Sequence, residues 1–180
     1  MPIKVGVIGT GYLGQHHARI YSEIPDAELV AIADIDEEKA KGFAEKYSCK
    51  ACSDYKEIID RVDALSIVTP TVYHHKIAME CLSAGKDLLI EKPITKTVEE
   101  ADELLSIAKD KGLILQVGHV ERFNAGFLAA AKVIDNPLFI ECHRLGPYKQ
   151  RSTDIGVVLS WVIPNSSPTR PVTSLTVHIL

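Results

Sequence analysis

The order of apolar and polar positions along the chain alternates between two patterns. Short runs rich in β-branched residues, such as IKVGVIG (3–9), AELVAIAD (27–34) and ALSIVTP (64–70), have the length and composition of buried parallel strands. Longer segments with helical spacing lie between them, such as YLGQHHARIYSEI (12–24) and DEEKAKGFAEKY (36–47). Strands that alternate with helices at this spacing predict a parallel sheet with helices on both faces.

The same alternation continues to residue 119. Further strands are predicted near Lys50–Cys52, over DLLIEKP (87–93) and over LILQVGH (113–119). The helices between them are predicted to begin at Ser53 or Asp54, over VYHHKIAMECLSAG (72–85) and over TVEEADELLSIAKDKG (97–112), where Thr97 and Glu100 form a capping box and Gly112 ends the helix. Six strands in this order predict an α/β fold with a doubly wound, Rossmann-type parallel sheet.

The pattern changes after His119. NAGFLAAAKVI (124–134) predicts a helix and PLFIECHRLG (137–146) predicts a strand, which would be only the start of a second α+β domain. We therefore expect a Rossmann domain over residues 1–120 and a connecting helix with the first strand of a second domain over 121–159. Residues 160–180 are expected to form an atypical tail, either non-native or disordered.

Three glycines close the first predicted strand in the pattern G-x-G-x-x-G. In a dinucleotide site, the first allows a tight turn, the second lets the backbone approach a pyrophosphate, and the third lets the helix pack on the strand. Asp34 follows at the end of the second strand, where its carboxylate would accept hydrogen bonds from an adenosine ribose and repel a 2′-phosphate. The next residue, Ile35, is not basic, so the pattern favours NAD over NADP. The residues expected to bind the cofactor here are Gly9, Thr10, Gly11, Tyr12, Leu13, Gly14 and Asp34. A Rossmann-like methyltransferase remains the alternative from another class of enzyme.

Charge and composition exclude several classes of partner. The net charge is −4 and there is no basic block, which argues against nucleic acid. No apolar run approaches the roughly 20 residues of a membrane span, and the N-terminus lacks the features of a signal peptide. We therefore expect no membrane association and a cytoplasmic location.

The spacing Cys49-x-x-Cys52 raises the possibility of zinc or redox chemistry. A structural zinc site needs a second pair of ligands, and none follows at a suitable spacing. A thioredoxin-like pair would open a helix directly after a strand, whereas this pair lies in and beside a short predicted strand. We expect reduced cysteines and no metal site.

A longer set of motifs resembles one enzyme family. The segment IVTPTVYHHKIAMECLSAGKDLLIEKPITKTVEEADELL (67–105) combines Thr-Pro at the end of a strand, a histidine soon after, Ala-Gly-Lys before the next strand, and then Glu-Lys-Pro. This combination resembles the glucose–fructose oxidoreductase/inositol dehydrogenase/MocA family, and the likeness runs from about Lys4 to Val158. Within the family, the likeness is greatest to members that act on nucleotide-linked amino sugars. It implies NAD-dependent oxidation of a secondary alcohol of a sugar, nucleotide sugar or cyclitol, or the reverse reduction.

The resemblance also implies roles for single residues. In this family, the lysine of Glu-Lys-Pro lies beside the nicotinamide and the substrate, which makes Lys92 the expected catalytic residue. Its ammonium could polarise a hydroxyl or a ketone during hydride transfer. Glu91 is expected to contact the nicotinamide ribose, and the Lys92–Pro93 peptide is expected to be cis. The resemblance places Thr69, Pro70, His74, Glu91, Lys92 and Pro93 along the cofactor.

Weaker expectations concern the segment after the sixth strand. The resemblance places His119 near the crevice, and Arg122 and Asn124 could reach the substrate. A purely structural role is an equal alternative for Arg122 and Asn124.

Two adjacent histidine pairs are also considered. Of His74 and His75, one is expected to face the cleft and the other the solvent. His16 and His17 follow the glycine loop, and we expect them only on the helix surface or in packing.

The likeness stops near Leu159. In the family, the helix that follows carries Asp-x-x-x-His with another Asp three residues beyond, and these positions here hold Ser160, Pro164 and Ser167. Proline inside a helix costs roughly 3 kcal/mol or more, so that helix cannot continue here. We therefore expect a truncated chain with little or no dehydrogenase activity, or alternatively a non-catalytic NAD-binding module. A homo-oligomer that pairs through the PLFIECHRL strand is also possible.

Overall fold

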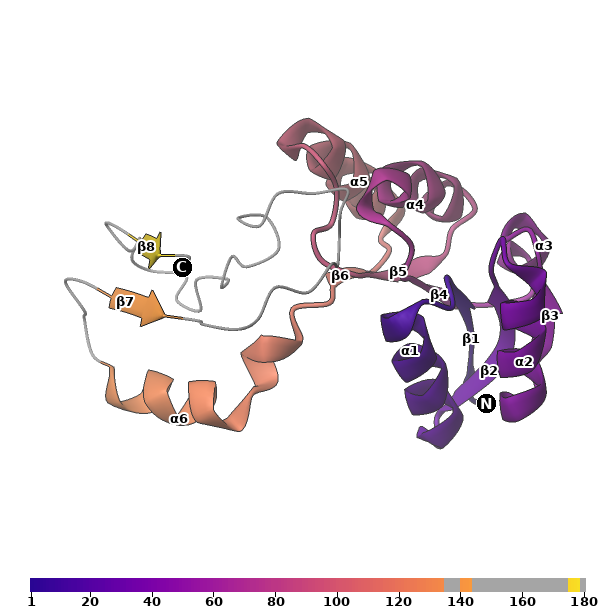
Figure 1. The fold of residues 1–180 in the computed structure, drawn as a ribbon. Coiled ribbons are helices and arrows are strands. Elements are labelled where there is room, and N and C mark those ends of the chain that lie inside the picture. The colour runs from indigo at the N-terminus through magenta and orange to yellow at the C-terminus, as the bar shows by residue number, and fades with distance from the viewer. Residues whose placement is uncertain (135–139, 144–174, 179–180) are drawn as a thin grey trace. The chain divides into compact units, whose positions relative to one another are not determined.

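The computed structural model describes residues 1–134, 140–143 and 175–178 (Figure 1). The chain divides into two units, Met1–Gly118 and His119–Leu180.

The first unit contains a six-stranded parallel sheet with the strand order β3-β2-β1-β4-β5-β6. The strands are β1 (Ile3–Ile8), β2 (Ala27–Ala33), β3 (Lys50–Cys52), β4 (Ala64–Ile67), β5 (Asp87–Ile90) and β6 (Leu115–Val117). The connecting helices are α1 (Tyr12–Glu23), α2 (Glu37–Tyr47), α3 (Lys56–Ile59), the 3₁₀ helix η1 (Thr71–Tyr73), α4 (His74–Ser83) and α5 (Val98–Lys111). The predicted Rossmann-type sheet is confirmed.

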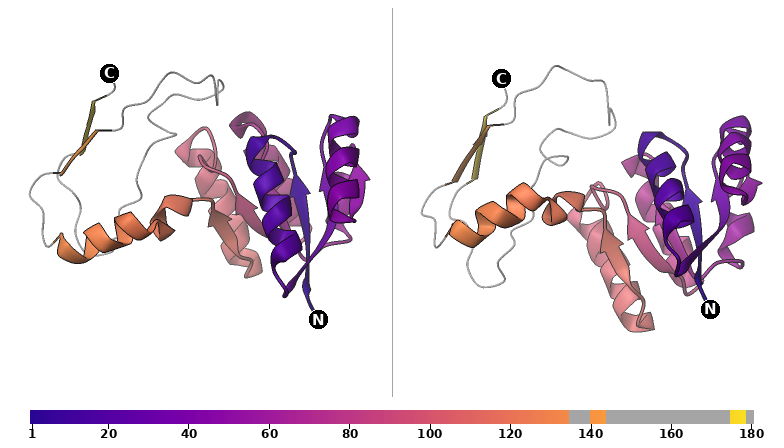
Figure 2. Two further views of the ribbon diagram at one scale, coloured as in Figure 1. Left: turned by 60° about the horizontal axis from the view of Figure 1, so that its bottom comes forward. Right: turned by 90° about the horizontal axis from the view of Figure 1, so that it is seen from below.

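Helices cover both faces of this sheet, and two further views show them beside the strands (Figure 2). Apolar side chains of α1 and α2, such as Ala18 and Phe43, pack with Val7 on one face. Side chains of α3, α4 and α5 pack on the other face, among them Ile58 and Leu104. Alternate residues of a strand point to opposite faces, so these short apolar runs are buried on both sides.

The helix ends follow the capping signals of the sequence. The Thr97 hydroxyl accepts a hydrogen bond from the backbone N–H of Glu100 at 3.2 Å, and Gly112 ends α5 with φ +66°. The Glu100 side chain accepts from the N–H of Lys96 at 3.0 Å. The capping-box prediction is thus confirmed at its Thr97–Glu100 bond. The predicted start of α3 at Ser53 or Asp54 is wrong: the Asp54 carboxylate accepts from the N–H of Lys56, which forms a turn, and the helix begins at Lys56.

The second unit begins with the 3₁₀ helix η2 (Val120–Phe123) and α6 (Ala125–Val133). The predicted strand within PLFIECHRLG is present as β7 (Ile140–His143). It pairs in parallel with β8 (Leu175–His178), a strand that the sequence did not predict within the expected tail. The remainder of that expected tail lies outside the described residues.

Candidate functional site

The order of strands reverses between β1 and β4, where the chain crosses from one half of the sheet to the other. In open parallel sheets, ligands bind at such a switch point, beyond the carboxyl ends of the strands. Backbone hydrogen bonds hold these ends together: Gly9 N–H donates to Ala33, Val68 N–H to Ile8 and Glu91 N–H to Ile67, at 2.8–2.9 Å. The loops that carry the expected site residues therefore lie along one edge.

This edge of the sheet has two regions. The glycine-loop region consists of residues 9–14 and Asp34, at the ends of β1 and β2. The Glu-Lys-Pro region consists of residues 69–74 and 91–93, at the ends of β4 and β5.

The three glycines of the loop meet different requirements. Gly9 has φ +102°, and a Cβ there would lie 2.6 Å from the carbonyl oxygen of Val68. A Cβ on Gly14 would overlap the carbonyl oxygen of Gly9, so α1 can pack here only without a side chain. A Cβ on Gly11, by contrast, would meet no described atom within 4 Å. The protein itself therefore requires Gly9 and Gly14, whereas Gly11 leaves the approach to the start of α1 open.

The start of α1 suits an anion. Gly11 is the N-cap residue and provides no side-chain hydrogen bond, and the first turn contains no acidic residue. The first N–H groups of a helix and its positive dipole end attract phosphate. Tyr12 and Leu13 form this first turn.

Asp34 is held firmly against the glycine loop. Its Oδ2 accepts hydrogen bonds from the backbone N–H and the hydroxyl of Thr10, both at 2.6 Å, and its Oδ1 accepts from the N–H of Asp36 at 2.9 Å. Thr10 is buried, so it acts on this edge by orienting Asp34. The sequence placed both residues at the site but did not predict that they contact each other.

These contacts keep Asp34 ionised. Partial burial raises the pKa of Asp34, but the hydrogen bonds from Thr10 and Asp36 and the charge of Lys39 outweigh this effect and hold the pKa below its usual value. The region thus presents an oriented carboxylate at neutral pH.

Glu91 is the corresponding carboxylate of the Glu-Lys-Pro region. Its Oε1 lies 3.0 Å from Nε2 of His17, and its Oε2 accepts from the backbone N–H of Lys92 at 3.2 Å. Burial raises the pKa of Glu91, but the hydrogen bond and charge of His17, with the N–H and charge of Lys92, hold it below its usual value. His17, expected only on the helix surface or in packing, is the residue here that the sequence missed.

His74 joins the two loops of the Glu-Lys-Pro region. The residue is 1% exposed, with Nδ1 3.0 Å from the carbonyl oxygen of Pro93 and Nε2 2.8 Å from that of Thr69. His75 lies on the exposed side of α4, where Nε2 contacts Glu103 at 2.8 Å. Lys92 is exposed, and its peptide bond to Pro93 is cis, as expected.

The residues expected near the substrate beyond β6 belong to the second unit. Asn124 caps α6, since its side-chain oxygen accepts from the N–H groups of Gly126 and Phe127 at 2.9 and 3.3 Å. The N–H of Arg122 donates to the carbonyl oxygen of His119 at 3.0 Å within η2. These contacts give Asn124 a structural role, while the expected substrate contacts of all three residues stay predictions.

The described cysteines are free thiols with little nucleophilic character. Burial raises the pKa of Cys49 to about 11 and that of Cys81 to about 12, and it also raises the pKa of Cys52. Across the described ranges, no group of three or more His, Cys, Asp or Glu side chains could hold a metal ion. Cys142 has no described side chain.

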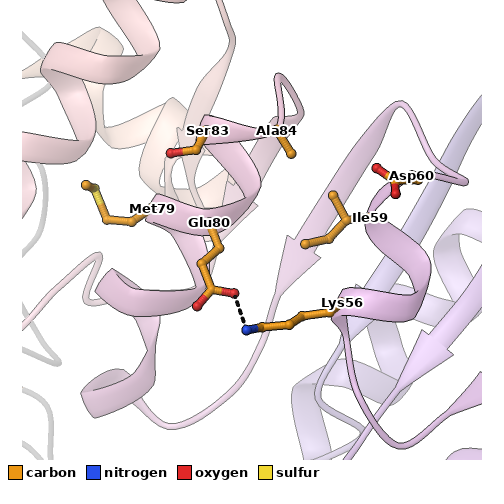
Figure 3. Close-up of a pocket in the computed structure, with 7 residues that line it drawn as sticks. All are labelled: Lys56, Ile59, Asp60, Met79, Glu80, Ser83 and Ala84. Carbon is orange, nitrogen blue, oxygen red and sulfur yellow. Dashed lines mark ion pairs between the residues drawn. The ribbon is translucent and has the colours of Figure 1, made fainter.

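A shallow hollow of about 550 Å³ lies between α3 and α4 (Figure 3). Lys56 and Glu80 form an ion pair across it at 3.3 Å, and Met79 and Ile59 are part of its wall. None of its lining residues belongs to the glycine-loop or Glu-Lys-Pro regions. The hollow is therefore not part of the sheet edge that carries the expected site residues.

In the part of the chain that the structure describes, none of the helices combines the length and apolarity that crossing a membrane requires. The cytoplasmic location stays a prediction.

The strand order, the glycine loop and the paired acidic residue define a dinucleotide-binding domain of the Rossmann class. Residues 3–119 match the profile of the GFO_IDH_MocA family, described as an oxidoreductase family with an NAD-binding Rossmann fold. The chain belongs to this family, and the resemblance proposed from the Glu-Lys-Pro segment is confirmed. NAD is the cofactor that this fold binds.

Three relatives illustrate the membership. A UDP-N-acetylglucosamine 3-dehydrogenase from Acidithiobacillus ferrooxidans is 38% identical over 169 residues, which cover 89% of this chain and 51% of that protein. Its solved structure superposes with a TM-score of 0.81 at 37% identity, covering 88% of this chain and 52% of that chain. An inositol 2-dehydrogenase from Rubrobacter xylanophilus is 30% identical over 174 residues, or 92% of this chain and 49% of that protein.

A structure of GenD2, from gentamicin A biosynthesis, in complex with NAD superposes with a TM-score of 0.72 at 26% identity, covering 73% of this chain and 38% of that chain. The chain thus spans about half the length of the curated relatives it matches.

Proposed function

We propose that this chain binds NAD along the carboxyl edge of its sheet as part of a dehydrogenase that acts on a secondary alcohol. The glycine-loop region would hold the pyrophosphate and the adenosine ribose, with Gly11 beside the phosphates and Asp34 on the ribose hydroxyls. The Glu-Lys-Pro region would hold the nicotinamide end, with Glu91 on its ribose. Strands β2, β1, β4 and β5 are consecutive neighbours in the sheet, so one extended ligand can contact both regions.

The residues present fit this cofactor. Bound NAD supplies a nicotinamide that accepts or gives a hydride, while the protein orients the reactants and polarises the substrate. Lys92 follows β5 and is exposed, so its ammonium is accessible to a substrate oxygen. It would donate a hydrogen bond to that oxygen and stabilise the charge that develops there.

The substrate class rests on the relatives. Their names include a dehydrogenase of a nucleotide-linked amino sugar and one of a cyclitol. We propose a sugar, nucleotide sugar or cyclitol, whose secondary hydroxyl would lie between Lys92 and the nicotinamide. A small-molecule substrate also agrees with the net charge of −4, which offers no attraction to nucleic acid.

The observation that carries the proposal is the oriented carboxylate of Asp34. Three donors, the backbone N–H and the hydroxyl of Thr10 and the N–H of Asp36, hold this carboxylate against the glycine loop. A vicinal ribose diol can donate two hydrogen bonds to such a carboxylate, whereas a phosphate there would be repelled.

Calorimetric titration of the chain with NADH, NADPH and S-adenosylmethionine tests this function. NADH is expected to bind more tightly than NADPH, and S-adenosylmethionine is not expected to bind. The isosteric change Asp34→Asn removes the charge and should weaken NADH binding about tenfold or more. It should also reduce the preference for NADH over NADPH.

Asp110→Asn, at an exposed position on α5, is the matched control and should change neither affinity. Equal affinities of the unmodified chain for NADH and NADPH would refute the role of Asp34. Binding of S-adenosylmethionine without NADH would refute the proposed function. Formation of NADH from NAD with UDP-N-acetylglucosamine or inositol as substrate, and its loss in Lys92→Met, would extend the result to catalysis.

A further inference from the structure

A largely buried network of polar side chains leads to Glu91 of the Glu-Lys-Pro region. The hydroxyl of Tyr21 lies 2.7 Å from Oγ of Ser66, and Ser66 Oγ lies 3.2 Å from Nδ1 of His17. Nε2 of the same imidazole contacts Glu91 at 3.0 Å. The side chains of His17 and Glu91 are only 13% and 9% exposed, and Ser66 is fully buried. This network of side chains thus connects α1, β4 and the end of β5.

The donors and acceptors of this network can be assigned from the chemistry of its side chains. An ionised Glu91 carboxylate only accepts, so Nε2 of His17 carries a hydrogen and donates it. When the ring is neutral, Nδ1 accepts from the Ser66 hydroxyl, which has a single hydrogen; when the ring is protonated, Nδ1 donates to Ser66 Oγ instead, and Nε2 donates to Glu91 in both forms. Ser66 Oγ in turn accepts from the hydroxyl of Tyr21. In the neutral form, every polar atom of the network is thus satisfied in one direction, from Tyr21 toward Glu91.

The surroundings of Glu91 leave its carboxylate few other partners. A Cβ on Gly118, which follows β6, would lie 2.9 Å from Oε1, so the backbone packs closely against it. The titratable groups that act on Glu91 are His17 on α1 and Lys92 next to it in the chain. A buried carboxylate without a partner is strongly disfavoured, so its orientation depends on these donors.

His17 and Tyr21 are placed for this contact by their helix. They lie one turn apart on α1, on the same side as Gly14 and Ala18, which are buried against the sheet. The close packing that Gly14 permits therefore also brings His17 to Glu91.

We propose that His17 is a positioning residue of this site, which orients the Glu91 carboxylate through Nε2 while Ser66 and Tyr21 fix the ring from the other side. The proposal rests on the proposed function only in assigning Glu91 to the nicotinamide ribose. The coupling of His17 to Glu91 is a property of the protein without ligand and can be measured separately.

Two substitutions of His17, by glutamine and by asparagine, test the contacts of its two ring nitrogens separately. In His17→Gln, the amide nitrogen can reach the position of Nε2 and still donate to Glu91. In His17→Asn, which is one methylene shorter, the amide can reach only the position of Nδ1 and contacts Ser66 instead. Both are uncharged and polar, so they differ mainly in whether Glu91 keeps its donor.

The first readout is the titration of the Glu91 side-chain carboxyl by ¹³C NMR, with the resonance assigned from Glu91→Gln. His17→Asn should raise the midpoint by about one pH unit or more, and His17→Gln by less. The second readout is NADH affinity, which should fall about tenfold in His17→Asn and remain closer to the original value in His17→Gln. The exposed His75–Glu103 pair supplies the matched control, and His75→Asn should change neither quantity.

An unchanged Glu91 midpoint together with unchanged NADH affinity in His17→Asn would overturn the proposal. Failure of NADH to bind even the unmodified chain would refute the proposed function, while the Glu91 titration would still decide the coupling. If His17→Asn does not fold, the unmodified chain remains decisive. Its long-range ¹H–¹⁵N spectrum should show the hydrogen of His17 on Nε2, and a hydrogen on Nδ1 alone would overturn the assignment.

Discussion

The two regions of the site edge are built in different ways. The glycine-loop region is held by its backbone conformation and by short contacts between neighbouring strand ends. Gly14 allows α1 to pack closely, and Thr10 holds Asp34 through two hydrogen bonds. In the Glu-Lys-Pro region, buried side chains from distant segments supply the structure, with His17 reaching Glu91 across 74 positions of sequence. The first region is therefore a property of a local motif, and the second is a property of the whole folded sheet.

The largest effect is expected from substitution at Gly14, compared with Gly11. In Gly14→Ala, the new Cβ would overlap the backbone of Gly9, which cannot move aside as a side chain could. We expect the free energy of unfolding to fall by more than about 3 kcal/mol, with a melting temperature lower by more than about 10 °C.

Gly11→Ala is the control within the same motif. Its Cβ would meet no described atom, and φ is −62°, so stability should change by less than about 0.5 kcal/mol. NADH affinity should still fall about tenfold or more, because the Cβ would stand where the pyrophosphate approaches. If both variants lost stability equally, the distinction between a packing glycine and a ligand glycine would be wrong.

The next largest effect is expected at His74 in the Glu-Lys-Pro region. His74→Leu removes a buried ring that lies between the carbonyl oxygens of Thr69 and Pro93, and the carbonyl to which the ring N–H donates loses its partner. Chemical denaturation should show a loss of about 2–3 kcal/mol. His75→Leu, on the exposed side of the same helix, should cost no more than about 0.5 kcal/mol. Similar losses for the two variants would show that the His74 contacts do not hold this region together.

The contrast between the regions also explains what the sequence could and could not predict. The doubly wound parallel sheet, the glycine loop and the position of Asp34 at the end of β2 followed from spacing, because each strand end and its turn are encoded by adjacent residues. The Glu-Lys-Pro motif indicated the family, but it did not show which buried side chains hold Glu91 in place. Periodicity showed that one face of α1 is buried, but it cannot tell which buried polar groups meet, so the contact of His17 with Glu91 was missed.

The same limit applies to His74 and to the second unit. The sequence placed His74 along the cofactor, which stays a prediction, but it did not predict that the ring lies between two backbone carbonyls, a contact that no side-chain pattern encodes. The strand Leu175–His178 was missed because the prolines around it dominate the local pattern, while its pairing with β7 is a long-range contact.

The smallest predicted effect compares the two carboxylates under acid conditions. Both pKa values lie below the usual ones, which are 4.5 for Glu91 and 3.8 for Asp34. A carboxyl whose pKa is lowered on folding stabilises the protein above its usual pKa, and this contribution is lost as pH falls through the folded-state value. Urea denaturation between about pH 5 and pH 3 should therefore show a falling free energy of unfolding.

Below about pH 4.5, Glu91→Gln should make the free energy of unfolding fall less steeply with decreasing pH. The difference is at most about 1.4 kcal/mol per pH unit, because one titrating group is removed. Asp34→Asn should act only at lower pH, below about 3.8. Glu91 depends on a histidine, whereas Asp34 depends on Thr10 and backbone N–H groups. His17→Asn, which removes the donor to Glu91, should therefore alter the pH window assigned to Glu91 and leave the window assigned to Asp34 unchanged. A change in both windows on substitution of His17 would mean that the two regions are coupled, and that the edge acts as one structural unit rather than two.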